Sequence, residues 1–597
     1  MSQLLTLADW RAAYAAGATP RELLKPVLDD GDPAWILRCD AAFIDAQIER
    51  LQDLTPADLP LLPLYGVPFA VKDNIDVAGL PTTAACPAFS HIAEQTATVV
   101  QRLMAAGAVL IGKTNLDQFA TGLVGTRSPY GEVPNTFDAA YVSGGSSSGS
   151  ASVVARGLVA FALGTDTAGS GRVPAGLNNL VGLKPTPGSV PMMGVLPACR
   201  SLDVVSVFAL TVADAAQVMA VMEGAGDEPV FQHHAPRPAW FNADALRVGV
   251  PKLPGCDETL GYAAAFDEAI AQLKSWGITP VEINMQPLFD VARLLYDGPW
   301  VAERLAVVQA LMENDPMAVD GTVRQVIEAA YRYDAVAAFR AQYELETLRA
   351  QIAPLWQSID VLMLPTTPTC PTLAAVAAAP IPRNSELGRF TNFVNLLGQA
   401  ALAVPSSFSA GGLPFGVTFV APGGSDAALV DLGLRWEAAR ALPLGRRLRA
   451  ATPADLLPQA MPISAPTMEI AVVGAHLAGM PLHGQMTERG CKLLARTQTA
   501  KNYRLFVLPG TLPPKPGLVR VTEIDNSGGA AIEVEVYAMP AAAVGSFLAL
   551  IPPPLGLGSV QLADGRWVKG FICEPSAIAG ATDITAHGGW RNDRASQ

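Results

Sequence analysis

The sequence predicts a large α/β domain built on a mixed sheet, followed by a smaller α+β domain. Three observations predict it: strand-like and helical segments alternate from Leu61 to about residue 445, a proline-rich break covers residues 451–467, and short β-rich segments begin at Met468. A chain of 597 residues also exceeds the ~100–200 residues of one typical domain, so at least two domains are expected.

The N-terminal region is predicted to be helical, because apolar residues in segments 5–17 and 19–30 recur with a spacing near 3.6. Thr19, Pro20 and Glu22 form a pattern typical of a helix start. A strand, a helix and a second strand are then predicted at residues 63–75, 96–107 and 108–115. We therefore expect residues 1–60 to form the helical beginning of a domain that continues over 61–450, with a linker at 451–467 and a second domain at 468–597.

Composition argues against several classes of partner. The net charge of −13, without a long Lys/Arg run, argues against nucleic acid, although one buried arginine could still bind a small anion. Two long uncharged stretches, residues 391–425 and 536–563, are interrupted by proline or glycine, so we expect no membrane span. The first residues do not resemble a signal peptide, and we expect a cytoplasmic protein.

Cysteine usage predicts neither a disulfide framework nor a zinc site. The seven cysteines are odd in number, widely scattered and never arranged as CxxC. We therefore expect no metal and no cofactor.

Two glycine-serine segments, YVSGGSSSG at 141–149 and GTDTAGSGR at 164–172, are the most informative stretches. By composition alone such a segment is most often a linker or a turn. Here each runs directly into apolar structure, and Lys72 stands at the end of the apolar strand PFAV. The pattern therefore favours an anchored floor where the backbone approaches a ligand.

In their order and spacing, the segments at 71–74, 144–149 and 164–172 resemble the amidase signature family, hydrolases that use a Ser–cis-Ser–Lys triad, over roughly residues 60–445. Ser148 and Ala168 depart from the commoner family pattern without removing a catalytic atom. The resemblance implies the amidase signature fold, a central mixed sheet covered by helices. It also implies that Ser170 is the nucleophile, Lys72 the base and Ser146 the proton relay between them. The oxyanion hole would be formed by Thr167, Ala168 and Gly169.

A lysine can act as this base only when it is neutral, so burial must lower the Lys72 pKa from ~10.4 towards working pH. A Ser-His-Asp hydrolase stays open as an alternative, but none of the six histidines lies beside a glycine-serine segment. We expect Asp166 and Arg172 to be a structural pair that holds the loop, and Asp73 with Asn74 to fix the lysine loop.

Within the family, segments 70–89, 164–188 and 388–405 look like the allophanate hydrolase group, whose substrate is a small anionic amide. That resemblance assigns Tyr296 and Arg304 to the substrate carboxylate and places the Gly122 backbone near the substrate. From the sequence pattern alone, Arg304 would more simply be a helix-surface arginine paired with an acid. Pro299 is suited to the first turn of the helix that would carry Arg304.

The same resemblance extends to the C-terminal domain, which begins near VVGAHLAGMPL and is similar to the gamma-glutamylcyclotransferase-like fold. It implies that the first domain converts allophanate to N-carboxycarbamate and ammonia. The second would assist decarboxylation, so that urea or cyanuric acid degradation ends in ammonia and carbon dioxide. His476 is the favoured acid-base residue of the second domain and His483 the next, although either could be structural.

The family also suggests a homodimer. Two other functions stay open: an amidase for another small amide such as malonamate, and an amidotransferase subunit that supplies ammonia to a partner. Neither requires a further C-terminal domain.

Overall fold

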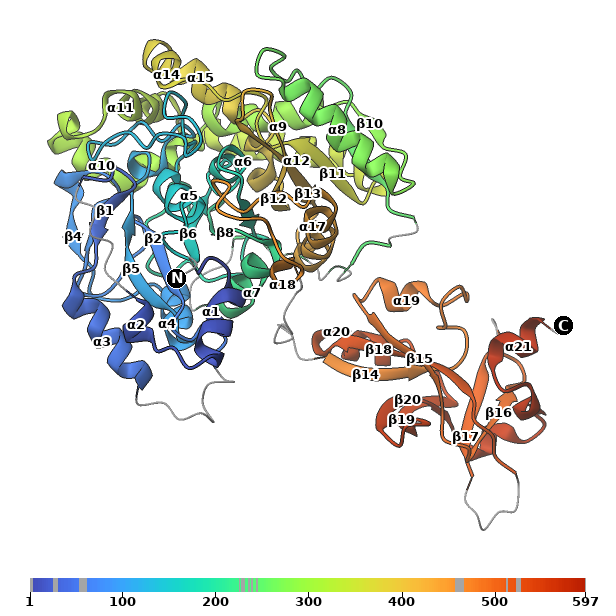
Figure 1. Cartoon of the computed structure of the whole chain (residues 1–597). Helices are drawn as coiled ribbons and strands as arrows, with labels where there is room; N and C mark the ends of the chain where they lie inside the picture. Colours follow the sequence, from blue (N-terminus) through green and yellow to red (C-terminus); the bar gives the residue numbers. More distant parts are fainter. Residues whose placement is uncertain are drawn as a thin grey trace. The chain divides into compact units, whose positions relative to one another are not determined.

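The structure is a computed structural model that describes residues 4–24, 31–52, 62–224, 226, 231, 232, 234, 237, 240–242, 245–456, 467–511, 514–521 and 528–595. The chain divides into two compact units, Met1–Ala235 with Phe241–Met461, and Pro236–Trp240 with Pro462–Gln597 (Figure 1). Part of the expected helical segment 19–30 and most of the expected linker, residues 457–466, lie outside the described residues.

The first unit is built on an 11-stranded sheet. Its strands are β1 (Trp35–Arg38), β2 (Pro68–Lys72), β5 (Val109–Thr114), β6 (Phe161–Asp166), β7 (Val181–Lys184), β8 (Val204–Ala209), β9 (Val248–Pro251), β10 (Val281–Ile283), β11 (Val361–Pro365), β12 (Ala400–Phe408) and β13 (Pro414–Ala421). Their order is β1-β5-β2-β6-β8-β7-β12-β13-β11-β9-β10. Strands β5, β2 and β6 run parallel, as do β11, β9 and β10, while the other neighbours are antiparallel. The predicted mixed sheet is confirmed.

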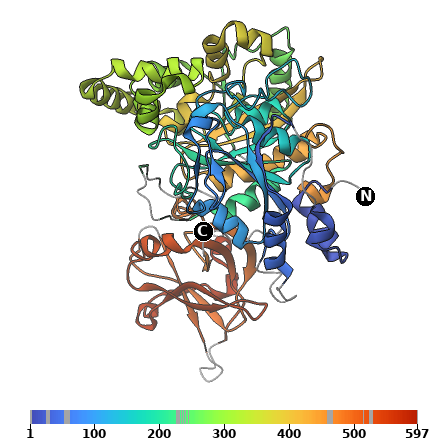
Figure 2. The ribbon, with the colours of Figure 1, turned by 90° about the vertical axis from the view of Figure 1, so that its left-hand side faces the viewer.

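Helices cover this sheet, and a separate two-stranded pair joins β3 (Pro81–Thr82) to β4 (His91–Ile92). The helices are α1 (Leu7–Ala15), α2 (Pro20–Leu23), α3 (Ala41–Gln52), α4 (Thr98–Ala105), α5 (Ser148–Ala155), α6 (Val173–Leu177), α7 (Val212–Met222), α8 (Tyr262–Ser275), α9 (Gln286–Asp297), α10 (Val301–Asn314), α11 (Gly321–Glu328), α12 (Ala335–Ile352), α13 (Leu355–Ser358), α14 (Leu373–Ala378), α15 (Pro380–Leu387), α16 (Asn392–Leu396), α17 (Asp426–Arg440) and α18 (Pro453–Leu456). Helix α5 packs on β6, α7 on β8 and α17 on β12. The green to yellow-green helices α10 and α11 extend from one side of the unit (Figure 2).

The sequence pattern locates the elements that carry the candidate site. The predicted strand, helix and strand at 63–75, 96–107 and 108–115 correspond to β2, α4 and β5. At the predicted helix start, the Thr19 backbone N–H donates to the Glu22 carboxylate at 2.8 Å.

Central strands of this sheet are apolar because both of their faces are covered. All residues of β2, β5 and β6 are buried, and the Phe69 and Phe161 rings stack with centroids 5.3 Å apart. A strand buried on both faces has a nearly continuous apolar sequence, so Lys72 at the end of PFAV enters a dry interior. None of the described helices is long and apolar enough to cross a membrane.

The second unit has α+β character, as predicted. Its elements are β14 (Thr467–Val472), α19 (Gly484–Thr487), β15 (Lys492–Gln498), β16 (Tyr503–Val507), β17 (Pro516–Arg520), β18 (Glu533–Pro540), α20 (Ala541–Leu548), β19 (Leu555–Gln561), β20 (Trp567–Cys573), β21 (Thr582–Asp583) and α21 (Trp590–Ala595). Strands β15-β18-β14-β20-β19 form one sheet and β17-β16-β21 another. A separate apolar core that includes Ile470, Val536 and Phe547 lies within this unit.

Candidate active site

Lys72 ends strand β2 between β5 and β6, and its side chain is completely buried. Its Nζ donates to Ser146 Oγ at 2.7 Å and to Thr165 Oγ1 at 2.8 Å. Both partners are neutral hydroxyls. The 2.7 Å bond means that the structure brings the predicted base Lys72 into direct contact with the predicted relay Ser146.

Burial lowers the pKa of Lys72 to about 7. The carboxylates of Asp117, Asp203 and Asp166 act in the opposite direction without cancelling the desolvation. A substantial fraction of Lys72 is therefore neutral near pH 7 and able to accept a proton.

The first glycine-serine segment reaches the lysine through a cis peptide bond between Gly145 and Ser146. The Ser146 carbonyl accepts the Asp117 backbone N–H at 3.1 Å, and α5 begins two residues later. A Cβ on Gly145 would lie 2.0 Å from Asp117 Oδ2, so glycine is required there for steric reasons. The Asp117 carboxylate thus packs directly beneath the segment.

Ser170 lies in the loop between β6 and α6, with only 2% of its surface exposed. Both Asp166 oxygens accept from Arg172, each at 2.9 Å, and the Gly171 N–H donates to the same carboxylate at 3.0 Å. Gly169 has φ +141°, and a Cβ there would lie 2.4 Å from Thr391 Oγ1. The expected Asp166–Arg172 pair is confirmed, and it holds the two ends of the Ser170 loop together.

The two glycine-serine segments pack against each other. Ser147 Oγ donates to the Thr165 carbonyl at 3.3 Å, and a Cβ on Gly144 would lie 3.1 Å from Pro174. Close backbone approach, the property expected of a catalytic floor, is therefore present at both segments.

The lysine loop is fixed as expected by Asp73 and Asn74. Asp73 forms a buried ion pair with Lys113 at 2.9 Å, and its carboxylate accepts from the Thr83 backbone N–H at 2.9 Å. Asn74 Nδ2 donates to the Leu196 carbonyl at 3.1 Å.

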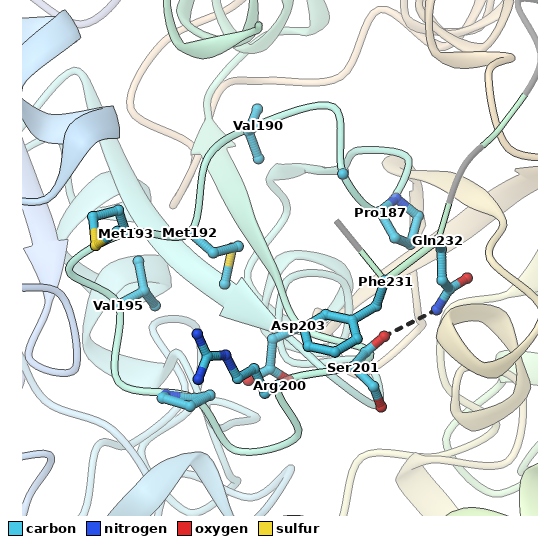
Figure 3. Close-up of a pocket in the computed structure, with 12 residues that line it drawn as sticks. Pro187, Val190, Met192, Met193, Val195, Arg200, Ser201, Asp203, Phe231 and Gln232 are labelled. Carbon is cyan, nitrogen blue, oxygen red and sulfur yellow. Dashed lines mark hydrogen bonds between the residues drawn. The ribbon is translucent and has the colours of Figure 1, made fainter. Parts of the chain in front are cut away.

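The predicted oxyanion-hole residues directly precede Ser170; they are Thr167, Ala168 and Gly169. The first of them, Thr167, is fixed by a hydrogen bond to Asp203. Thr167 Oγ1 donates to Asp203 Oδ1 at 2.5 Å, and Asp203 Oδ2 accepts the Ala198 N–H at 2.6 Å. Burial raises the pKa of Asp203 to about 6. Asp203 also lines a cavity of ≈ 280 Å³ with Arg200, Met192 and other residues of the β7–β8 connection (Figure 3).

Tyr296 and Arg304 come together at the junction of α9 and α10. The Arg304 guanidinium lies over the Tyr296 ring, 5.1 Å from its centroid, and Nη1 donates to Cys199 Sγ at 2.9 Å. Arg304 is only 2% exposed, and its Nε and Nη2 have no hydrogen-bond partner within the described part of the chain. Arg304 is therefore not the surface arginine that the sequence pattern alone favours. Helix α10 begins at Val301, so Pro299 lies just before the helix and Arg304 in its first turn.

A buried guanidinium with open donors is costly unless an anion binds there. Tyr296 also lines a cavity of ≈ 420 Å³ together with Arg127 and Asn384. Asn384 Oδ1 accepts the Leu123 N–H at 2.7 Å, so this cavity borders the loop that contains Gly122. A Cβ on Gly122 would lie 2.5 Å from Asp117 Oδ2, which explains why glycine stands there. Of the three predicted substrate-binding positions, Tyr296 lines this cavity, Arg304 contacts Tyr296, and Gly122 lies in the loop bonded to Asn384.

In the second unit, His476 lies just after β14 in an aromatic environment. Its ring stacks on Phe571 with centroids 4.9 Å apart, and Nε2 is 2.9 Å from Gln485 Oε1. Burial lowers the His476 pKa below its usual value, which favours the neutral imidazole. A small cavity of ≈ 30 Å³ is lined by His476 and Lys515. His483 Nδ1 lies 3.2 Å from the backbone carbonyl oxygen of His476, so the second candidate histidine contacts the backbone of the first.

Four residues that contact the site were missed by sequence reasoning: Asp117, Thr165, Cys199 and Asp203. Asp117 follows the end of β5, and a polar residue after a buried strand is the one signal that could have found it. Within the described ranges, no group of three or more His, Cys, Asp or Glu side chains could hold a metal ion.

The family described as Amidase matches residues 37–430, and the allophanate hydrolase C-terminal domain matches residues 468–595. The urea amidolyase of Saccharomyces cerevisiae is 43% identical over 608 residues, covering 98% of this chain and 33% of that protein. The chain therefore spans about a third of the length of that relative. A solved structure of Kluyveromyces lactis allophanate hydrolase is 43% identical with a TM-score of 0.83, and the match covers 100% of both chains. A glutamyl-tRNA(Gln) amidotransferase protein from Synechococcus is 34% identical, over 70% of this chain and 93% of that protein.

Proposed function

The chain belongs to the amidase family and ends in an allophanate hydrolase C-terminal domain, and from this premise we propose that it hydrolyses allophanate. One observation carries the choice of substrate: Arg304 is a buried cation with two open donors above Tyr296. Allophanate is a small amide that bears a carboxylate, and a guanidinium pairs well with a carboxylate because its donors are planar and charged.

In the proposed first step, Ser170 Oγ attacks the carbonyl carbon that carries the amino group. Its proton passes through Ser146 to neutral Lys72, a route supported by the 2.7 Å contact between Lys72 and Ser146. The protonated lysine then returns a proton to the leaving nitrogen, and the C–N bond breaks to release ammonia. Water hydrolyses the resulting Ser170 ester, which gives N-carboxycarbamate and regenerates the serine.

Backbone N–H groups of Thr167, Ala168 and Gly169 are proposed to stabilise the negative oxygen of each tetrahedral intermediate. The Thr167 bond to Asp203 supports this role because it fixes the start of that segment. Arg304 with Tyr296 would bind the substrate carboxylate, and the Gly122 loop would complete the pocket.

In the second unit, we assign decarboxylation of N-carboxycarbamate to His476. The N–C bond breaks, carbon dioxide leaves, and the nitrogen retains the electron pair and takes a proton from water, which gives carbamate. Carbamate then decomposes to ammonia and carbon dioxide. A neutral imidazole held by Gln485 is suited to acid-base exchange near neutral pH.

The two alternative functions are supported less well. An amidase for malonamate and an ammonia-supplying amidotransferase subunit both account for the first unit, and the amidotransferase relative covers 70% of this chain. Neither accounts for residues 468–595.

We assign the enzyme to the cytoplasm, since all seven cysteines are buried and unpaired, as a reducing compartment allows. We also propose that it forms a homodimer. Val336, Phe339 and Tyr343 share one face of α12 and are 55%, 56% and 67% exposed, and such an apolar face is typical of an interface.

The substrate assignment predicts that the purified chain releases ammonia from allophanate. Ser170→Ala and Lys72→Ala should each lower the rate by at least about 10³-fold, because acyl transfer loses its nucleophile or its base. Ser152→Ala, a buried serine on α5 outside the site, is the matched control and should keep the wild-type rate. Turnover of malonamate without turnover of allophanate would refute the assignment.

For the second unit, we expect His476→Ala to release the first ammonia at the wild-type rate while carbon dioxide release slows and N-carboxycarbamate accumulates. The two products are followed separately by an ammonia assay and by ¹³C NMR of labelled substrate. His483→Ala is the comparison and should have the smaller effect. An unchanged rate of carbon dioxide release by His476→Ala would remove this histidine from the mechanism.

The dimer is tested by sedimentation velocity at micromolar concentration. Wild type should sediment as a dimer and Phe339→Glu/Tyr343→Glu as a monomer, because two charges would be buried unpaired at the interface. Leu253→Glu, at an apolar position elsewhere that is 78% exposed, should remain dimeric. A monomeric wild type would disprove the proposal.

A further inference from the structure

The turn Ala198–Asp203, which leads into β8, contacts both halves of the proposed substrate site. At one end Cys199 accepts a hydrogen bond from Arg304, the residue proposed to bind the substrate carboxylate. At the other end Asp203 accepts a hydrogen bond from Thr167, the first residue of the proposed oxyanion hole. These two contacts join segments that are far apart in the sequence.

Cys199 is chemically suited to hold the guanidinium. Its thiol donates to the Trp300 carbonyl at 3.6 Å while its sulfur accepts from Arg304 Nη1 at 2.9 Å. Burial raises the pKa of Cys199 to about 12, so the thiol keeps its proton. With Nη1 committed to the sulfur, Nε and Nη2 are the donors that remain open for a ligand.

Asp203 fixes the backbone of Cys199 as well as the side chain of Thr167. The Cys199 N–H donates to Asp203 Oδ2 at 3.1 Å, and the Ala198 N–H donates to the same oxygen at 2.6 Å. A shift of the turn would therefore move the Arg304 anchor and the Thr167 anchor together.

The middle of the turn is anchored on three sides. The Glu303 carboxylate, next to Arg304 on α10, accepts the Ser201 backbone N–H at 2.9 Å and the Ser201 hydroxyl at 2.5 Å. Gln232 Nε2 donates to the Ser201 carbonyl at 3.1 Å (Figure 3), and Asn395 Nδ2 donates to the Leu202 carbonyl at 3.1 Å. The turn is thus a rigid connection to α10.

We propose that Cys199 is a positioning residue for substrate specificity: through the Ala198–Asp203 turn it sets the place of the Arg304 guanidinium relative to the oxyanion hole. The two open donors then face a carboxylate only when the amide carbonyl is aligned with Thr167–Gly169. The inference rests on the proposed function, because it assumes that Arg304 binds the carboxylate of an anionic amide.

The test measures binding to the Ser170→Ala form of the whole 597-residue chain, which forms no acyl-enzyme. Calorimetry is carried out with malonamate, which carries a carboxylate and a primary amide, and with malonamide, its uncharged counterpart. Cys199→Ala should raise the Kd of malonamate about tenfold, since a hydrogen bond to a charged group is lost, and change the Kd of malonamide less than about twofold. Cys199→Ser should stay within about twofold of the parent, because a hydroxyl can also donate to Trp300 and accept from Arg304.

A double-mutant cycle with Arg304→Ala separates positioning from general stability. In the Arg304→Ala background, Cys199→Ala should cause no further loss of malonamate binding. The inference is overturned by an equal loss for both ligands, by a loss that persists without Arg304, or by a folded Cys199→Ser chain that binds as poorly as Cys199→Ala. The Ser170→Ala variant reports binding and no turnover. The proposed function is tested separately: it is overturned if the wild type fails to release ammonia from allophanate.

Discussion

The buried contact of Lys72 with two hydroxyls is the constraint on which the rest of the site depends. A lysine without a carboxylate partner in a dry interior loses its proton readily, and here burial brings its pKa to about 7. Lys113, on the neighbouring strand β5, is equally buried but is paired with Asp73 at 2.9 Å. Burial lowers the pKa of Lys113 as well, but there the Asp73 carboxylate acts in the opposite direction through direct contact. The two buried lysines therefore differ in their direct partners, hydroxyls for Lys72 and a carboxylate for Lys113.

Three buried carboxylates surround this lysine, and none of them forms an ion pair with it. Asp117 accepts the backbone N–H groups of Val124, Gly125 and Arg127. Asp166 is committed to Arg172, and Asp203 to Thr167 and the turn at residues 198–199. Each carboxylate shapes one loop of the site, and its hydrogen bonds keep it away from Lys72 Nζ. The same hydrogen bonds of these three carboxylates therefore fix the loops and leave Lys72 without a carboxylate partner.

The sequence predicted the parts of the site that are marked by local pattern. Lys72 follows a buried apolar strand, and the serines lie in glycine-rich segments that run into structure, so both could be found from neighbouring residues. Asp203 and Cys199 could not, because their partners lie 36 and 105 positions away along the chain. Burial of Arg304 was likewise out of reach, since the α10 sequence alone is compatible with a surface helix and only the packing of α9 and the 198–203 turn covers it.

The central claim, that neutral Lys72 is the base, is tested most directly by the pH dependence of kcat/KM for ammonia release from allophanate. Only the unprotonated lysine can accept the serine proton, so kcat/KM should fall about tenfold per pH unit below a pKa near 7 and level off above it. A value of kcat/KM that stays constant from pH 9 down to pH 5.5 would contradict the account.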